Sequence, residues 1–154
     1  SGNVTVSAEP TGLWEEVDAV LGARTFDAQV TVEQTGAETK VIADPMRVRQ
    51  IIRNLLGNAE RYGGDRVTVR VVERDEYASL FVIDDGPGVP EAERERVFER
   101  FARLDDARAR AAGGTGLGLA IVRGIAVRHG GTVAVDDTPG GGASFVVRLP
   151  PTDP

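Results

Sequence analysis

The chain has 154 residues, a formal net charge of −6 and an apolar fraction of 41%, which predict one folded domain with a substantial core. The acidic balance argues against non-specific binding to nucleic acid or to an anionic membrane, because such binding needs an excess of Lys and Arg. The absence of cysteine excludes disulfides and thiolate chemistry. The only lysine is Lys40, so a Walker A loop is excluded as well.

The N-terminal part is predicted to form a strand, a helix and a hairpin. Residues 4–6 alternate as a short strand does, and Thr11 is expected to cap the following helix. The apolar positions of that helix are Leu13, Val17, Val20 and Leu21. Trp14 lies beside this stripe and is interpreted as a packing residue. Residues 30–32 predict another strand, and residues 41–43 are expected to be its short return strand.

A long amphipathic helix is predicted next, with Asp44 as N-cap and Pro45 in the first turn. Its core-facing stripe consists of Val48, Ile51, Ile52, Leu55, Ala59 and Tyr62. Asn54, Asn58 and Arg61 form a second, polar strip on the helix, because residues at i, i+4 and i+7 share one face. This strip is either a solvated surface or an oxygen-rich site, since amide oxygens suit Mg²⁺.

Residues 66–73 alternate as a strand with one wet face, and the more apolar residues 80–83 form its neighbour. The second strand runs into Asp84-Asp85-Gly86-Pro87-Gly88. A carboxylate at the end of a buried strand costs free energy unless it has a hydrogen-bonding partner, which a ligand could supply. The glycines would let a planar ligand approach the backbone. A purely structural hairpin is the alternative, because Asp-Gly turns are common after strands.

Beyond Pro90 the chain is predicted to form a charged helical segment over residues 91–98, with Phe98 and Phe101 as core residues. Residues 104–114 lack apolar periodicity and have arginines spread along them, and a loop of this length without structure is typical of a functional lid; an ordinary solvated loop is the alternative. The arginines at issue are Arg103, Arg108 and Arg110.

A glycine-rich stretch at residues 113–118 then opens a helix, where exposed backbone N–H groups favour an anion. The Rossmann spacing is not met, because Leu119 stands where a glycine would be required. This helix is expected to end at His129, the only histidine, in a C-capping role before Gly130. Alternating strands at residues 133–135 and 145–149 complete the chain.

Four segments in this order resemble the N, G1, F and G2 boxes of the catalytic and ATP-binding domain of bacterial sensor histidine kinases (HATPase_c, GHKL superfamily). They are residues 54–62, 84–88, 97–101 and 114–119. The resemblance extends over roughly residues 4–150. It implies an α/β fold: a two-layer α/β sandwich whose mixed β-sheet is covered on one face by helices, with a mobile ATP lid.

The resemblance also implies residue roles. Asp84 would accept a hydrogen bond from the adenine amino group, and Asn58 would hold Mg²⁺ on the phosphates. Asn54 and Arg61 would join Asn58 as catalytic residues. The implied nucleotide-binding residues are Asn58, Tyr62, Asp84, Gly86, Gly88, Arg103, Arg108, Arg110, Gly114, Thr115, Gly116, Leu117, Gly118 and Leu119. Arg61 replaces the Lys of many relatives, and a planar guanidinium contacts phosphate differently from an ammonium.

The implied function is to bind Mg-ATP and to transfer the γ-phosphate to a histidine on a separate dimerisation domain in two-component signalling. Residues 1–154 are then one kinase domain, with Ser1-Gly2 as a candidate cloning remnant and the phosphotransfer domain absent. The implied partners are that domain and a response regulator. The expected setting is the cytoplasmic part of a membrane-bound bacterial sensor, with the isolated domain monomeric, not touching the membrane and unable to phosphorylate itself.

Three other functions are weighed against this one. A nucleotide-sensing module without phosphotransfer remains open, although every box is intact. An ATP hydrolase of the same fold is disfavoured, because Asn54 occupies the position at which such enzymes carry a general-base Glu, and an amide cannot take the proton. A serine kinase on this fold is disfavoured by the complete F box.

Overall fold

The computed structural model describes residues 6–23, 29–35, 40–62, 65–73, 76–99, 118–138 and 141–150; the side chains of Gln34, Thr35 and Tyr62 are outside this description. The elements, in chain order, are β1 (Glu9–Gly12), α1 (Leu13–Ala23), β2 (Gln29–Thr35), β3 (Lys40–Ala43), α2 (Pro45–Tyr62), β4 (Arg66–Glu73), β5 (Ala78–Asp84), the 3-10 turns η1 (Glu91–Glu93) and η2 (Arg96–Phe98), α4 (Gly118–Arg128), β6 (Thr132–Asp137) and β7 (Ala143–Leu149).

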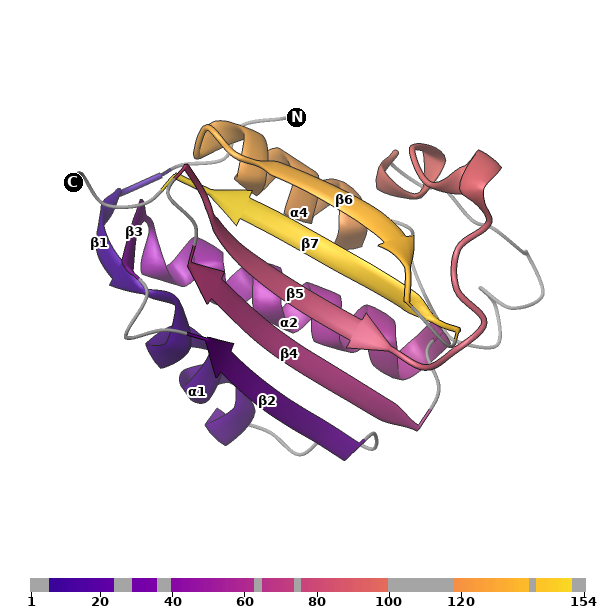
Figure 1. The fold of residues 1–154 in the computed structure, drawn as a ribbon. Coiled ribbons are helices and arrows are strands. Elements are labelled where there is room, and N and C mark those ends of the chain that lie inside the picture. The colour runs from indigo at the N-terminus through magenta and orange to yellow at the C-terminus, as the bar shows by residue number, and fades with distance from the viewer. Residues whose placement is uncertain are drawn as a thin grey trace.

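The main sheet has five strands in the order β2-β4-β5-β7-β6, and α1, α2 and α4 all lie on one face of it (Figure 1). β2 pairs with β4 in parallel, whereas the other neighbours in the sheet are antiparallel. This arrangement confirms the predicted two-layer sandwich with a mixed sheet. α2 and α4 run antiparallel behind the sheet, so the end of α2 and the start of α4 lie at the same end of the molecule (Figure 1).

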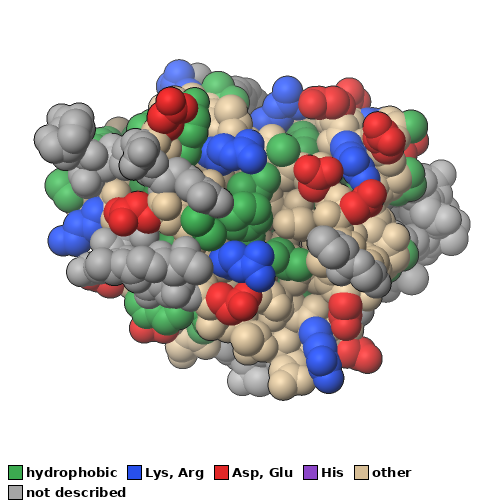
Figure 2. Space-filling view, viewed as in Figure 1, with side chains coloured by type: hydrophobic (Ala, Val, Ile, Leu, Met, Phe, Trp, Pro, Cys, Tyr) green, Lys and Arg blue, Asp and Glu red, His purple; other side chains and the backbone are tan. Residues whose placement is uncertain are grey.

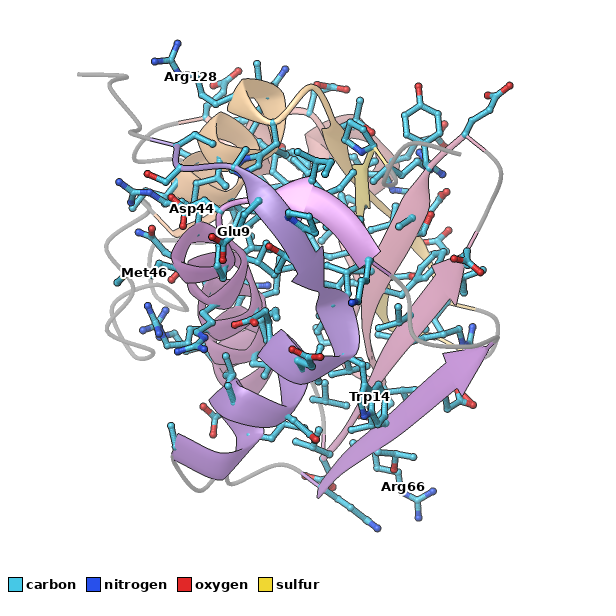
Figure 3. All side chains as sticks on the ribbon, turned by 90° about the vertical axis from the view of Figure 1, so that its left-hand side faces the viewer. Glu9, Trp14, Asp44, Met46, Arg66 and Arg128 are labelled. Atoms are coloured by element: carbon cyan, nitrogen blue, oxygen red, sulfur yellow. The ribbon has the colours of Figure 1, made fainter. Side chains whose placement is uncertain are left out.

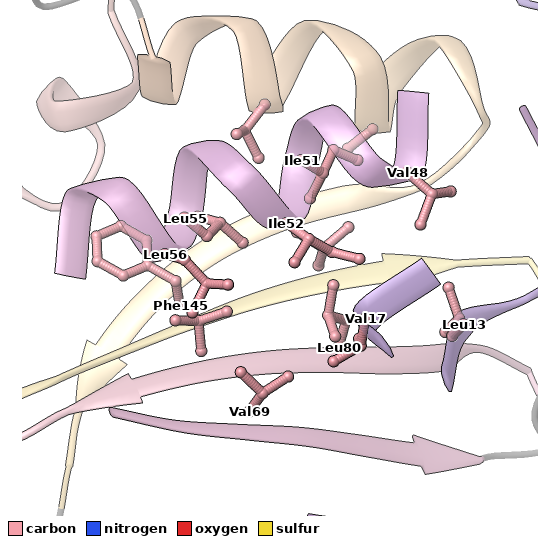
Figure 4. Close-up of a cluster of buried hydrophobic side chains, with 14 of the residues drawn as sticks. Leu13, Val17, Val48, Ile51, Ile52, Leu55, Leu56, Val69, Leu80 and Phe145 are labelled. Atoms are coloured by element: carbon pink, nitrogen blue, oxygen red, sulfur yellow. The ribbon is translucent and has the colours of Figure 1, made fainter. Parts of the chain in front are cut away.

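The core fills the space between the sheet and the helices (Figure 4). The predicted stripe of α2 faces it, with Ile52 and Leu55 fully buried, and Val69 of β4 is equally inaccessible. Burial of one such side chain stabilises the fold by about 1.5–3 kcal/mol. Trp14 is partly buried and packs against the same cluster, which confirms its interpretation as a packing residue.

The N-terminal prediction was wrong for Thr11, whereas most of the strand predicted at residues 4–6 lies outside the described residues. Val6, its one described residue, is not part of a strand, and the first described strand is Glu9–Gly12. Thr11 belongs to that strand and does not cap a helix. Its hydroxyl donates to the carbonyl oxygens of Glu9 and Ala43, at 2.9 and 2.8 Å. A buried Thr that bonds the backbone of two strands has the same residue type as an N-cap, which explains the error.

The return strand was also misassigned. β3 pairs with β1, antiparallel, in a separate two-stranded sheet, and not with β2. Val41 and Ala43 bury one face of this small sheet. β2 instead lies along β4, with Val30 opposite Val67 and Val32 opposite Val69. Because strands close in sequence need not pair, local alternation predicts that a strand exists but not its neighbour.

The face of the sheet away from the helices is only partly polar (Figure 2). Arg66 is exposed and Thr68 and Arg70 are half-buried there, which confirms the predicted wet face of β4. Phe81 and Ile83 of β5 are half-buried on the same side. Figure 2 shows apolar side chains at the centre of this face, with Lys or Arg side chains beside them.

The N-cap prediction for α2 is confirmed, and the side chain of His129 contacts the same N-cap residue, Asp44. The Asp44 carboxylate accepts the Met46 N–H at 3.0 Å. His129 Nε2 accepts the Asp44 N–H at 3.0 Å, and Nδ1 lies 2.8 Å from the Ile125 carbonyl oxygen, to which it must donate. His129 therefore caps α4 as predicted, and its ring also links the end of α4 to the start of α2. Figure 3 shows this end, with Asp44 and Arg128 labelled.

Candidate functional site

The candidate site begins at Asp84, the last residue of β5. Alternation along β5 puts Asp84 on the same face as Leu80 and Val82, so its carboxylate points to the core side and is 6% exposed. Its Oδ1 accepts backbone N–H groups from Gly86 at 2.9 Å and from Ala143 at 3.2 Å. Among the described residues none donates to Oδ2. One oxygen is therefore held by backbone N–H groups, and the other has lone pairs that no donor in the described part of the chain occupies.

The turn after β5 is fixed by close backbone packing against the turn between β6 and β7. Gly88 has a φ of +80°, and a Cβ there would lie 3.1 Å from the Gly142 carbonyl oxygen. Gly142 has a φ of +104°, and a Cβ there would overlap the Asp84 carbonyl oxygen. Both positions therefore require glycine, for conformation and for space. Gly142 and Ala143 were missing from the predicted site.

The C-terminal end of α2 lies at the same end of the sandwich as the end of β5 (Figure 1), and the polar strip belongs to this half of the helix. Asn58 is half-buried, and its side chain has no hydrogen-bonding partner among the described residues; Arg61 is exposed. Asn54 is also half-buried, and its Nδ2 donates to the Gly118 carbonyl oxygen at 3.3 Å. That bond joins the strip to the first residue of α4, so the structure brings Asn54 and Gly118 together as predicted site residues.

The segment after the turn is helical as predicted, but it forms the two 3-10 turns η1 and η2 instead of an α-helix. Val97 and Phe98 are buried, and the Phe98 ring meets Phe145 edge to face, with centroids 6.2 Å apart and planes at 83°. Phe98 is thus a core residue as predicted. It packs the segment that follows the Asp84 turn onto β7, which also carries Ala143.

Part of the predicted site lies outside the described residues. The residues outside this description are the arginines of the proposed lid, Phe101 and most of the glycine-rich stretch, together with the side chain of Tyr62. By number they are Phe101, Arg103, Arg108, Arg110, Gly114, Thr115, Gly116, Leu117 and the Tyr62 side chain. Leu119 is described; it is half-buried and packs against the core, so its side chain has a structural role.

Comparison with known proteins agrees with this geometry. Residues 43–153 match the model of the family described as histidine kinase-, DNA gyrase B-, and HSP90-like ATPase. The chain is 43% identical over 138 residues to the probable sensor histidine kinase TcrY of Mycobacterium tuberculosis, covering 87% of this chain and 29% of that protein. It is 35% identical over 149 residues to the sensor histidine kinase CpxA of Escherichia coli K12, covering 96% and 33%.

Solved structures are similar as well. The mycobacterial sensor histidine kinase MprB superposes with a TM-score of 0.80 at 34% identity, over 94% of this chain and 98% of that one. Full-length ShkA in complex with AMPPNP superposes with a TM-score of 0.82 at 29% identity, over 96% and 32%. The chain belongs to the histidine kinase-, DNA gyrase B- and HSP90-like ATPase family. Within that family it corresponds to the catalytic, ATP-binding domain of sensor histidine kinases, and it spans about a third of TcrY or CpxA.

Proposed function

We propose that this domain binds Mg-ATP, with adenine recognised at Asp84, and transfers the γ-phosphoryl group to a histidine on a dimerisation domain. The observation that supports it most is the Asp84 carboxylate: buried, with Oδ1 held by two backbone N–H groups and Oδ2 without a described donor. Such an oxygen fits the exocyclic amino group of adenine. It would repel the carbonyl that guanine carries at the same position.

A magnesium ion would be held by Asn58 together with the phosphates and water. The half-buried Asn58 carboxamide is not engaged by any described residue, and an amide oxygen is a hard ligand of the kind that Mg²⁺ accepts. The ion would neutralise charge on the phosphates. Asn54 lies one turn earlier on α2, and through Gly118 it would hold the start of α4, where backbone N–H groups could face an anion.

Binding is tested by calorimetry with ATP and GTP on wild-type protein, Asp84→Ala and Asp85→Ala. Asp84→Ala should weaken ATP binding by about 1.5–3 kcal/mol, the range for hydrogen bonds to charged groups. Asp85→Ala is the matched control, because Asp85 is exposed and bonds the Arg66 N–H at 3.1 Å. Equal affinity of the wild-type protein for ATP and GTP would exclude this assignment of the pocket.

Transfer is tested with γ-labelled ATP, using the isolated chain and the chain mixed with the dimerisation domain of its full-length protein. The isolated chain should not become labelled. Both ring nitrogens of His129 are bonded, and His129 lies 11 positions after Gly118, about 16 Å along the helix at 1.5 Å per residue. Labelling of the added domain's histidine would support kinase function. Tight ATP binding with no transfer would favour a nucleotide-sensing module.

We further propose that the whole protein is a membrane-bound bacterial sensor that passes the phosphoryl group to a response regulator. The support is the relatedness to sensor histidine kinases about three times as long as this chain. Within the described residues no helix is long and apolar enough to cross a bilayer.

A further inference from the structure

Arg94 lies between η1 and η2 and joins two segments that are far apart in sequence. Its Nε donates to the Val89 carbonyl oxygen at 3.3 Å. Its Nη1 lies 3.3 Å from Asp136 Oδ1, and its Nη2 lies 2.6 Å from Asp137 Oδ1. One guanidinium thus contacts the end of the Asp84 turn and the end of β6 at the same time, which its planar fork of donors permits.

Both segments lead directly to Asp84. On one side, Val89 follows Gly88, which packs against the Gly142 carbonyl oxygen. On the other side, Asp137 pairs across the strands with Ala143, whose N–H donates to Asp84 Oδ1. The two turns that hold the carboxylate therefore meet at Gly88 and Gly142, and Arg94 connects them just beyond that contact.

The environment of Arg94 differs from that of the other ion pairs nearby. Its side chain is only 22% exposed, whereas Asp136 and Asp137 are 80% and 75% exposed. Among the residues that the structure describes, Arg96, two positions further on, pairs only with Glu93 within its own segment. Figure 2 shows acidic and basic side chains interleaved at this end of the sheet. Because the acceptors of Arg94 belong to two different segments, its contacts restrain the backbone of one segment relative to the other. An ion pair within one segment, such as that of Arg96, has no such effect.

We propose that Arg94 is a positioning residue for the nucleotide site: by joining Val89 to Asp136 and Asp137, it keeps the Asp84 turn and the β6–β7 turn in contact and so fixes the Asp84 carboxylate. The proposal rests on the proposed function, because the affinity it governs is that for adenine nucleotide. Arg94 itself does not touch the ligand.

The test compares Arg94→Ala with Arg96→Ala. Arg94→Ala should raise the Kd for ADP about 3- to 5-fold, the upper part of the range for losing partly exposed ion pairs. Arg96→Ala removes an equally charged side chain from the same segment and should change the Kd less than about 2-fold. A charge exchange, Arg94→Glu with Asp137→Arg, should bind ADP more tightly than Arg94→Glu alone. Equal Kd values for wild-type protein and Arg94→Ala, or equal losses in the two alanine variants, would overturn the proposal.

Hydrogen exchange of the nucleotide-free protein separates this inference from the proposed function. In Arg94→Ala the Gly86 and Ala143 amides, both bonded to Asp84, should exchange about 10-fold faster, while the α1 amides should be unchanged. Unchanged Gly86 and Ala143 exchange would refute the positioning role, even if the wild-type protein binds ADP. If the wild-type protein binds no nucleotide, the proposed function fails, whereas faster exchange in the variant would still support the restraint by Arg94.

Discussion

Replacing Gly142 with Ala tests how the Asp84 carboxylate is held. The added Cβ would overlap the Asp84 carbonyl oxygen and lie 2.8 Å from the Asp84 carbonyl carbon and 3.0 Å from the Asp85 Cα. The φ of +104° alone costs a non-glycine residue about 1–3 kcal/mol. Relief of the overlap must move the two turns apart, which breaks the Ala143 bond to a charged oxygen, worth about 1.5–3 kcal/mol. We expect a total loss of about 2.5–6 kcal/mol in unfolding free energy.

Gly141→Ala is the matched control, because Gly141 has a φ of +108° but nothing within 4 Å of an added Cβ. It should lose only the conformational part, about 1–3 kcal/mol, and its ADP affinity should be close to that of the wild-type protein. Gly142→Ala should bind ADP at least about 10-fold more weakly, which corresponds to the loss of one such bond. Urea unfolding and calorimetry give both quantities. If the two variants match in stability and in affinity, the backbone contact does not position Asp84.

Other substitutions test the remaining parts. Asn58→Ala should weaken ATP binding more with Mg²⁺ than with EDTA, and equal losses would exclude a metal role. His129→Ala should lower the unfolding free energy by about 1–3 kcal/mol, since it leaves the Asp44 N–H unpaired and removes one of the two donors to the Ile125 carbonyl oxygen; exposed Val127→Ala should cost less than about 0.5 kcal/mol. Burial raises the pKa of Asp44, but N–H donors of Ser7, Met46 and Arg47 outweigh it and hold that pKa below its ordinary value. Asp44 therefore stabilises the fold fully above about pH 4 and progressively less as the pH falls through the lowered value. Acid unfolding should thus be steeper for the wild-type protein than for Asp44→Asn, and equal pH slopes would contradict this assignment.

The fold was predictable wherever one periodic segment determines its own structure. α2 has an Asp-Pro start and an apolar stripe over 18 residues, so local signals and burial agree. The β4 and β5 pair was equally clear, because alternation in one strand and a short connection determine register and direction. In both cases the residues that decide the structure are neighbours in the sequence.

Strand pairing over longer distances was not predictable. The choice of β2 to pair with β4, and of β3 to pair with β1, depends on which apolar faces meet across the whole domain. His129 is a similar case. Its position before Gly130 indicated a cap, but its hydrogen bond with the N–H of Asp44, the N-cap residue of α2, depends on a contact between residues 85 positions apart.

The same distinction between local and long-range determinants applies to the candidate site. Residues that would face the ligand with their side chains, such as Asp84 and Asn58, could be proposed from the sequence because such chemistry needs a particular residue type at a particular spacing. The supports of Asp84 act through backbone atoms, so Ala143 has no recognisable side chain, and Gly142 resembles an ordinary turn glycine. Arg94 looked like one charge among many in a charged segment. Its three acceptors belong to segments that meet only in the folded chain, so its contribution follows from the tertiary structure and from no motif.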